Sequence, residues 1–280
     1  MRAWDVVLEA AEQLAAAGVA SPAADARWLV CHVLDCDAAA LVTRELGPEA
    51  RARVAHLVER RRAGEPVQYI TGQAAFRYAM LAVGPGVFIP RPETELLVDQ
   101  VLHFLGEHPT ARRVVELCAG SGAITHSLAT ERGGLELHAV ERSPEAWPWL
   151  LRNLDGLGVD CRLGDMAEEF GDLDAQVDVV VANPPYVPEA VRDLLPPDVA
   201  WDPQEALFAG ADGLAALRVV RQVAARLLRE GGLIAVEHDE SHAAQVLELF
   251  APPDFVRART VRDLAGRPRH CLARRGRMGG

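Results

Sequence analysis

The second half of the chain contains short apolar runs of strand character, separated by segments in which apolar residues recur with helical spacing. The clearest of these runs are RVVELC, LELHAVE, DVVVAN and GLIAVEH. Helices are expected to begin near Ala123, Pro144, Gly213 and His242. Nearly continuous Val, Leu and Ile runs that alternate with helices are typical of a parallel sheet buried on both faces. We therefore expect an α/β fold built around a doubly wound, mostly parallel sheet.

Two further strands are expected near the end of the chain. The segment FVRARTVRDLAGRPRHCLAR predicts a strand pair joined by a turn at residues 265–268. An antiparallel pair that closes an otherwise parallel sheet is common in α/β enzymes. Together with a weaker strand just ahead of Asp165, these runs predict a mostly parallel, seven-stranded sheet.

The chain is expected to be helical up to about Ile70. WDVVLEAAEQLAAAG shows helical spacing and ends at Gly18, a residue suited to the position after a helix C-terminus. Ser21 and Pro22 form the usual start signature of a second helix, with Ser21 as the capping residue. A third helix is expected over residues 48–62. This part contains no catalytic cluster, so we expect a small helical-bundle domain that docks a partner.

The segment from Tyr69 to Pro90 differs from both of its neighbours. It contains β-forming and aromatic residues and the sequence Gly-Pro-Gly at residues 84–86, which together predict a β-hairpin connector. A helix is expected to begin after Pro92. We therefore divide the chain into a helical domain (1–68), a hairpin connector (69–90) and an α/β domain (91–280).

The chain is acidic, with a formal net charge of −11 over 280 residues. An acidic protein is a poor nucleic-acid binder, because phosphate binding requires clustered cations. Two local clusters are basic, with five Arg at residues 51–62 and eight Arg from residue 257 onward. We interpret them as a solvated helix face and a basic tail, so direct nucleic-acid binding is not expected.

The cysteine pattern bears on the cellular compartment. The five cysteines are odd in number and show no Cys-x-x-Cys spacing, which argues against a disulfide framework or zinc site and for a reducing cytoplasm. No His-x-His or His-Glu-x-x-His spacing indicates another metal. No apolar stretch reaches the roughly 18 residues of a membrane span, and no secretory signal is expected at the N-terminus. We expect a cytoplasmic, metal-free monomer.

A loop of small residues follows the first of the four apolar runs. In VVELCAGSGAITHSLA a strand ends near Glu116, the small residues turn, and a helix begins. Such a loop lets the backbone approach a ligand, while the N–H groups of the helix N-terminus face it. The dinucleotide pattern G-x-G-x-x-G would need Gly or Ala at position 125, where this chain has Thr125. Taken alone, the loop indicates a cofactor without identifying it.

Acidic residues follow the next two strands. Glu141 lies about 20 residues after Gly122, where a carboxylate can accept hydrogen bonds from both hydroxyls of a ribose. Asp165 follows the third strand, where it can accept from an exocyclic amine. The carboxyl ends of parallel strands meet at one edge of a sheet, so these residues together predict a nucleoside site. Their order resembles that of a class I S-adenosylmethionine-dependent fold.

The fourth strand ends in Asn183-Pro184-Pro185-Tyr186. This segment resembles the N-P-P-Y motif of methyltransferases that act on planar nitrogen, in adenine or guanine amines or in the glutamine amide. The lone pair of such a nitrogen is delocalised, so it is a poor nucleophile and needs orientation and acceptors for its N–H groups. The Asn183 side-chain oxygen and the Pro184 carbonyl can supply two acceptors, which the prolines hold in place by fixing φ. Tyr186 can pack over the planar group.

Further segments extend the resemblance beyond this shared motif. They are QYITG, VFIPRPETELLV, ELCAGSGAIT, AVERSPEA, VDVVVANPPYVP, DPQEALFAGADGL, LLREGGLIAVEH and VRDLAGRPRH. Over roughly four-fifths of its length the chain is similar to the N5-glutamine methyltransferases of peptide-chain release factors, the HemK/PrmC family. IPRPETE and DLAGR are more specific than N-P-P-Y, which DNA and RNA enzymes share.

The resemblance implies a class I, Rossmann-like fold and a defined reaction. The methyl group of S-adenosylmethionine is transferred to the side-chain amide N5 of the glutamine in the Gly-Gly-Gln (GGQ) loop of a release factor, leaving S-adenosylhomocysteine. Attack is in line on the sulfonium methyl carbon, and the proton leaves the nitrogen afterwards to water. The helical N-terminal domain is expected to help to recognise the release factor.

The resemblance also implies roles for individual residues. Cofactor binding is assigned to Glu116, Cys118, Ala119, Gly120, Gly122, Glu141, Arg142, Asp165, Met166 and Asn183. Substrate binding is assigned to Phe88, Pro90, Arg91, Asn183, Pro184, Pro185 and Tyr186, among which Asn183, Pro184 and Tyr186 are the expected catalytic residues. The chain departs from the family pattern in the first loop, where Cys118 and Ala119 replace Gly and Thr, and at Glu141, where Asp is more frequent.

Other substrates remain alternatives. An exocyclic amine of DNA or RNA is supported only by the two Arg clusters and is opposed by the net charge of −11. A ribosomal-protein glutamine is disfavoured by the matches outside the shared core. A cofactor-binding module without catalysis is opposed by Asn183 and Pro184 but is left open by Cys118. The sequence does not indicate which release factor is preferred.

Overall fold

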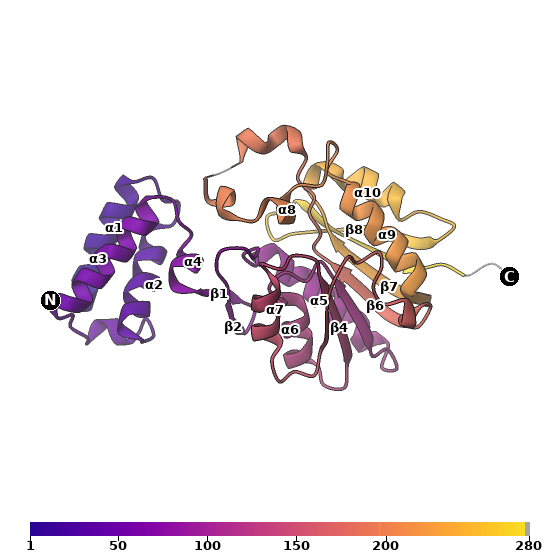
Figure 1. Ribbon diagram of the computed structural model, residues 1–280, viewed down its shortest axis with the longest axis horizontal. Helices are drawn as coiled ribbons and strands as arrows, with labels where there is room; N and C mark the ends of the chain where they lie inside the picture. Colours follow the sequence, from indigo (N-terminus) through magenta and orange to yellow (C-terminus); the bar gives the residue numbers. More distant parts are fainter. Residues whose placement is uncertain (196, 278–280) are drawn as a thin grey trace. The chain divides into compact units, whose positions relative to one another are not determined.

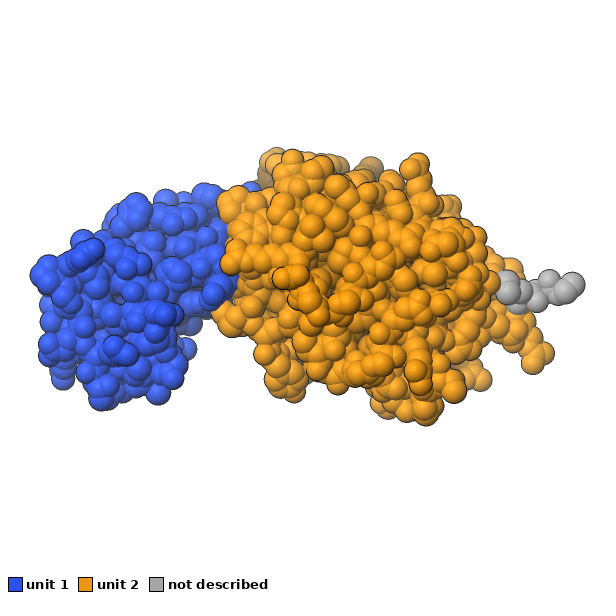
Figure 2. Space-filling view, turned by 60° about the horizontal axis from the view of Figure 1, so that its bottom comes forward, with its two compact units in different colours: residues 1–73, 196–201 blue, residues 74–195, 202–280 orange. Residues whose placement is uncertain are grey.

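The computed structural model describes residues 1–195 and 197–277. The chain divides into two compact units (Figure 2). Unit 1 comprises residues 1–73 and 196–201, and unit 2 comprises residues 74–195 and 202–280. Among the described residues, no helix combines the length and the apolar character needed to cross a membrane.

Unit 1 is helical. Its elements are α1 (Ala3–Ala16), α2 (Pro22–Leu34), η1 (Ala40–Val42), α3 (Pro48–Arg62), α4 (Val67–Thr71) and η4 (Pro197–Trp201). Apolar residues at helical spacing, such as Val6, Ala10 and Leu14 of α1, form one buried core with α2 and α3. The third helix spans the predicted residues 48–62, and Gly18 follows α1 with a φ of 79°.

Two details of unit 1 differ from the sequence prediction. Pro22 begins α2 as expected, but the Ser21 side chain makes no capping hydrogen bond. Arg61, which we placed on a solvated face, is 5 % exposed, and its Nε donates to Asp25 Oδ2 at 2.8 Å. A buried guanidinium needs a charged partner to offset its lost hydration, so this ion pair ties α3 to α2. An Arg-rich run gives no sign of which Arg turns inward.

Unit 2 is built on a seven-stranded sheet with the order β5-β4-β3-β6-β7-β9-β8 (Figure 1). The strands are β3 (Arg113–Leu117), β4 (Glu136–Glu141), β5 (Asp160–Leu163), β6 (Val177–Ala182), β7 (Leu228–Glu237), β8 (Phe255–Arg262) and β9 (Pro268–Arg275). The five strands from β5 to β7 are parallel, while β9 is antiparallel to both β7 and β8. The predicted mostly parallel sheet with an antiparallel closing pair is confirmed.

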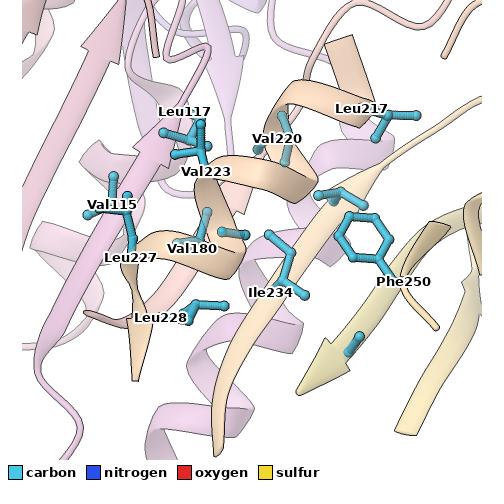
Figure 3. Packing of buried hydrophobic residues seen from close by; sticks show 14 of the residues in the cluster. Val115, Leu117, Val180, Leu217, Val220, Val223, Leu227, Leu228, Ile234 and Phe250 are labelled. Carbon is cyan, nitrogen blue, oxygen red and sulfur yellow. The ribbon is translucent and has the colours of Figure 1, made fainter. Parts of the chain in front are cut away.

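Helices cover both faces of this sheet. On one face lie α5 (Pro92–Glu107), α6 (Ala123–Glu131) and α7 (Trp147–Leu154), and on the other lie α9 (Ala215–Leu227) and α10 (Ala243–Leu249). Successive strand residues point to opposite faces, so Val114 packs with α5 and α6 while Val115 and Val180 pack against α9 (Figure 3). Burial on both faces explains the nearly continuous apolar runs in the sequence.

Short elements complete unit 2. They are η2 (Gly171–Leu173), η3 (Glu189–Leu194), α8 (Gln204–Leu207) and η5 (Glu240–His242). The predicted helix starts are correct to within three residues, and α7 begins at Trp147 instead of Pro144. The strand β7 begins four residues earlier than the run GLIAVEH suggested.

The β-hairpin lies ahead of the predicted turn. Its strands are β1 (Gln73–Phe76) and β2 (Ala79–Ala82), so the turn is at Arg77 and Tyr78, whereas Gly-Pro-Gly follows β2. A turn is present at residues 84–86 as predicted, where the Val87 N–H donates to the Gly84 carbonyl at 3.3 Å, but it does not join the two strands of the hairpin. The strand character of residues 69–71 was wrong, since they lie in α4. A Cβ on Gly84 would lie 2.5 Å from the Trp149 ring, so this glycine permits close packing on α7. Arg77 anchors the turn through ion pairs with Asp99 and Glu131.

The second Arg cluster is not a tail over most of its length. Residues 255–275 form β8 and β9 with the turn between them. The Arg274 guanidinium lies 4.1 Å from the centre of the Phe104 ring, and Arg275 Nη1 donates to the Asp254 carbonyl at 2.7 Å. These two cations are therefore held by contacts within the fold and are not part of a solvated tail.

We expect Asp25→Ala to destabilise unit 1 by about 2 kcal/mol, because Arg61 would lose a charged partner while remaining buried. Amide hydrogen exchange in α2 and α3 measures this change against the amides of unit 2. Asp5→Ala is the matched control, since it removes a carboxylate from an exposed pair with Arg2 in the same unit. That control should cost less than about 1 kcal/mol. Equal effects of the two substitutions would contradict the role of the buried pair.

Candidate functional site

The carboxyl ends of four strands are neighbours at one edge of the sheet of unit 2. β6 pairs with β3, β3 pairs with β4, and β4 pairs with β5, all in parallel. The strand order reverses between β3 and β6, and ligands in open α/β sheets bind beside such a reversal. The predicted cofactor residues and the Asn183 loop lie at this edge, so we take it as the candidate site.

The loop after β3 is open on one side and packed on the other. Gly120 and Gly122 have φ values of 54° and 78°, in the left-handed region that favours glycine. A Cβ on Gly122 would lie 2.8 Å from Leu150 of α7, whereas a Cβ on Gly120 would meet no atom within 4 Å. The buried Ala119 donates its N–H to the Val140 carbonyl at 3.0 Å and ties the loop to β4. Gly120 therefore faces space into which a ligand can fit.

Cys118 occupies a strained position in the same loop. Its φ of 58° is one that residues with a Cβ rarely adopt. Its Sγ lies 3.7 Å from Met166 Sδ, so the loops after β3 and β5 meet here. Burial, and then the charge of Glu141, raise the pKa of the Cys118 thiol well above its ordinary value of 9.0. The side chain is a neutral thiol at physiological pH.

Glu116 lies beneath the loop. It is 2 % exposed, and its Oε2 accepts a hydrogen bond from the Thr125 N–H in the first turn of α6 at 2.8 Å. Burial raises the pKa of this carboxyl from 4.5 to about 8. Glu116 thus binds the start of α6 through one carboxylate oxygen, and its role toward the cofactor stays a prediction.

Glu141 stands at the end of β4 and faces the loop after β3. Its Oε2 accepts from the Gly120 N–H and its Oε1 from the Ser143 N–H, both at 2.7 Å. A carboxylate has about four acceptor positions, so each oxygen can still accept from a hydroxyl group. The neighbouring Arg142 is exposed and lies 3.8 Å from Glu205 of α8. Glu141 is thus positioned by two backbone groups and retains acceptor capacity.

Asp165 lies after β5, at the far end of the candidate site. It is exposed, and its Oδ1 accepts from the Ala167 N–H at 2.9 Å. This bond fixes the turn that also places Met166 beside Cys118. The second oxygen of Asp165 is available to accept from a bound amine.

The loop after β6 contains Asn183 and the two prolines. Asn183 is half-buried, and its Nδ2 donates to Thr94 Oγ1 of α5 at 3.2 Å. Pro184 is buried and Pro185 is half-buried. The Tyr186 hydroxyl donates to Glu237 Oε1 at 3.1 Å, and burial raises the pKa of Tyr186 well above its ordinary value. Tyr186 is therefore anchored at its hydroxyl end as a neutral phenol.

The segment from Phe88 to Arg91 is held by a buried acid. Asp202 is 3 % exposed, accepts from the Ile89 N–H at 3.2 Å and pairs with Arg91. The Arg91 guanidinium in turn lies 5.0 Å from the centre of the Phe88 ring. The Asp202 carboxylate therefore holds the segment that contains three predicted substrate residues, Phe88, Pro90 and Arg91.

Sequence reasoning missed Thr94, Asp202 and Glu237. Each lies within a segment that carried the family resemblance, namely IPRPETE, DPQEALF and GLIAVEH. For Glu237 the available signal was a charged residue at the end of an apolar strand, since burial of a lone acid requires partners. Among the described residues no group of three or more His, Cys, Asp or Glu side chains could hold a metal ion.

Comparisons with known proteins agree with this geometry. A family model described as PrmC N-terminal domain matches residues 5–72, and one described as Conserved hypothetical protein 95 matches residues 68–197. A release factor glutamine methyltransferase from Streptomyces coelicolor is 43 % identical over 274 residues, with 96 % of both chains covered. This chain belongs to the release factor glutamine methyltransferase family. A further member from Mycolicibacterium smegmatis is 43 % identical over 267 residues, with 94 % of both chains covered.

A solved structure of another protein has a similar fold to this chain. The hMettl16 catalytic domain, in complex with MAT2A 3'UTR hairpin 6, has a TM-score of 0.57 at 14 % identity. The match covers 70 % of this chain and 74 % of that one. At so low an identity the likeness concerns the fold alone, and it confirms the predicted class I, Rossmann-like arrangement.

We expect Glu116→Gln to remove part of the pH dependence of stability. The folded protein holds a proton on Glu116 up to about pH 8, whereas the unfolded chain releases it near 4.5. The wild type is therefore expected to lose stability as pH rises through this window, by on the order of 1 kcal/mol per pH unit relative to the variant. Denaturant unfolding of both proteins at a series of pH values measures the difference. Stability curves that run parallel over the whole window would contradict the raised pKa.

We expect Cys118→Gly to be more stable than Cys118→Ala by about 1 kcal/mol. Both variants lose the thiol and its contact with Met166, but only the alanine keeps a Cβ at a φ of 58°. Urea unfolding of the two variants isolates the strain of the left-handed backbone from the loss of the sulfur. If the alanine variant proves equally stable, the backbone at position 118 carries no such strain.

Proposed function

We propose that this protein transfers a methyl group from S-adenosylmethionine to the side-chain amide nitrogen of the glutamine in the GGQ loop of peptide-chain release factors. The observation that carries the proposal is the placement of Asn183 and Pro184 directly after β6, next to the open loop after β3. Membership of the release factor glutamine methyltransferase family over nearly the whole chain supports the substrate.

The cofactor fits the residues present at the strand ends. The space beside Gly120, the remaining acceptor capacity of Glu141, and the exposed carboxylate of Asp165 suit a nucleoside with a ribose and an exocyclic amine. Glu141 would hold the ribose, Asp165 and Met166 the adenine side, and the loop from Cys118 to Gly122 the methionine part. When bound, S-adenosylmethionine supplies an electrophilic methyl group on a sulfonium centre.

The protein's own residues prepare the amide nitrogen. Asn183 Oδ1 and the Pro184 carbonyl would accept from the two N–H groups and so orient the nitrogen lone pair for in-line attack. As nitrogen gains positive charge, its N–H groups become stronger donors, and these fixed acceptors stabilise the transition state more than the ground state. Methyl transfer would leave a positively charged, N-methylated amide, which is acidic enough to lose a proton from nitrogen to water, so no catalytic base is required. Phe88, Pro90 and Arg91 would flank the glutamine, and Tyr186 would pack against it.

We further propose that three segments of the chain have separate roles. Residues 1–68 would recognise the release factor, residues 69–90 would connect, and residues 91–280 would carry the methyl transfer. The match of residues 5–72 to the PrmC N-terminal domain supports the first assignment. All five cysteines are free, which suits a protein that acts as a monomer in the reducing cytoplasm, where translation occurs.

Labelled S-adenosylmethionine tests the proposal. The full-length protein is incubated with a purified release factor, the same factor with alanine in place of the GGQ glutamine, a ribosomal-protein fraction, and tRNA or DNA. We expect label in the unaltered release factor alone. Label only in nucleic acid would overturn the proposal in favour of an exocyclic-amine methyltransferase. Cofactor binding without any label would instead indicate a module that has lost catalysis.

We expect Asn183→Ala to lower turnover on the release factor by about a hundred- to a thousandfold, the usual loss for one preorganised transition-state partner. Cofactor affinity, measured by calorimetry, should fall much less than turnover, because the other proposed cofactor residues are unchanged, and this binding serves as the control for folding. Turnover close to that of the wild type would remove Asn183 from the mechanism.

A further inference from the structure

A chain of hydrogen bonds links the Asn183 side chain to a buried carboxylate. Asn183 Nδ2 donates to Thr94 Oγ1 at 3.2 Å, and Thr94 Oγ1 donates to Glu237 Oε2 at 2.7 Å. The other oxygen of Glu237 accepts from the Tyr186 hydroxyl at 3.1 Å. Thr94 and Glu237 are 4 % and 1 % exposed, so water does not compete for these bonds. We call these four side chains the Asn183 network.

The carboxylate sets the direction of the bonds in the Asn183 network. An ionised carboxylate can only accept, so the single hydroxyl proton of Thr94 must be donated to Glu237. The Thr94 oxygen then offers lone pairs alone, and an amide in contact with it must present its NH2 group. A reversed Asn183 would bring two acceptor oxygens together in a buried place, which is costly. The Asn183 oxygen is therefore turned away from Thr94.

The Asn183 oxygen that points away has no partner among the residues that the structure describes. Over residues 1–195 and 197–277, Asn183 Oδ1 accepts no hydrogen bond, and it is not sealed from solvent. The side chain is held through its nitrogen and available at its oxygen, which makes it a preoriented acceptor. The Pro184 carbonyl oxygen next to it is likewise an acceptor only, and Pro184 has no N–H group that could act as a competing donor.

The Glu237 carboxylate is expensive to bury, which argues that it is kept for a purpose other than stability. Besides the two hydroxyl donors, Glu237 faces the ring of His270, whose Nε2 lies 3.7 Å from Oε2. His270 is itself fully buried, and neither of its ring nitrogens has a hydrogen-bond partner among the described residues. Buried ionic groups are often no more stabilising than apolar ones, so a gain in specificity is the better explanation.

We propose that Thr94 and Glu237 are positioning residues that make this site select an amide over a carboxylate. By holding the Asn183 oxygen outward, they present an acceptor that pairs with a glutamine N–H group and repels a glutamate oxygen. This inference rests on the proposed function and names the feature of the same site that discriminates between the two side chains.

Hydrogen bonding is the means by which such discrimination can be made. Glutamine and glutamate have nearly the same shape and volume, so packing cannot separate them. They differ in charge and in whether the terminal group donates or only accepts. A site built from fixed acceptors pairs with the donor and leaves the carboxylate facing like-signed oxygens, which is rejection by an unfavourable contact.

A purely structural role for the Asn183 network has to be separated from a positioning role. The network also ties α5 to the ends of β6 and β7, so removing it could simply loosen unit 2. A structural role predicts that Thr94→Val lowers stability and leaves the preference for glutamine unchanged. A positioning role predicts a change in preference, because the freed Asn183 amide can turn and present its NH2 group to a carboxylate.

The test compares Thr94→Val and Thr94→Ser in the full-length protein. Binding of the release factor, and of a version with glutamate in place of the GGQ glutamine, is measured by calorimetry with S-adenosylhomocysteine present. We expect the wild type and Thr94→Ser, which keeps the hydroxyl, to prefer the glutamine form. In Thr94→Val this preference should narrow by about tenfold or more, and kcat should fall about ten- to a hundredfold while KM changes less.

Two further variants make the outcome decisive. Glu237→Gln keeps the shape but turns one acceptor into a donor, so it should narrow the preference as Thr94→Val does, even if the valine variant folds poorly. Thr130→Val is the matched control, because that exposed residue's hydroxyl donates to carbonyls of its own helix, those of His126 and Ser127. An unchanged preference in both Thr94→Val and Glu237→Gln would falsify the inference. A wild type that methylates no release-factor glutamine would instead overturn the proposed function.

Discussion

The pairing of β3 with β6 is the constraint on which the candidate site depends. These strands are far apart in sequence but adjacent in the sheet, with Val114 opposite Val179 and Leu117 opposite Ala182. Parallel pairing makes both strands end at the same edge, so the glycine-containing loop and the Asn183 loop lie side by side. A shift of this register by one residue would turn every buried valine of β6 to the opposite face, so the core that holds the sheet together also fixes the site.

Three carboxyl groups near this edge behave differently because their surroundings differ. Glu116 is buried with a backbone N–H as partner, and its pKa rises. Glu141 is half-buried and accepts from two backbone N–H groups while retaining acceptor capacity. Glu237 is buried but accepts from two hydroxyl groups, and through them it orients neighbouring side chains. Glutamate thus serves in three ways here: as a protonated anchor for a helix, as an acceptor that is held by the backbone and keeps free lone pairs, and as a carboxylate that orients neighbouring hydroxyl groups.

The mostly parallel sheet and the helices on both of its faces followed from the sequence because they rest on periodicity. Apolar runs of strand length alternate with helical segments, and this pattern is visible without knowledge of contacts. The hairpin turn at Arg77 and Tyr78 did not follow, because neither residue is a usual turn former. The nearby Gly84 and Gly86 instead allow close packing against Trp149 and Glu145. Arg61 was misplaced because a run of arginines does not show which one meets Asp25 across the bundle.

The residues of the candidate site likewise include some that the sequence predicted and some that it did not. Asn183, Glu141 and Asp165 could be named from the sequence, because each directly follows or ends a strand and so must lie at the sheet edge. Thr94, Asp202 and Glu237 act through other residues at sequence separations of up to 143 positions, and no local pattern signals such partners. Supporting side chains become apparent only when burial and hydrogen-bond direction are known.

The protonation state of Cys118 has a consequence for the selectivity of the chemistry at this edge. A thiolate is a far better nucleophile than an amide nitrogen, and one placed in the loop after β3 would compete for any electrophilic methyl group bound there. Burial and the nearby charge of Glu141 keep the sulfur protonated, so it is a poor nucleophile in this position. In this protonated state Cys118 would not be methylated by a methyl donor bound at the same edge of the sheet.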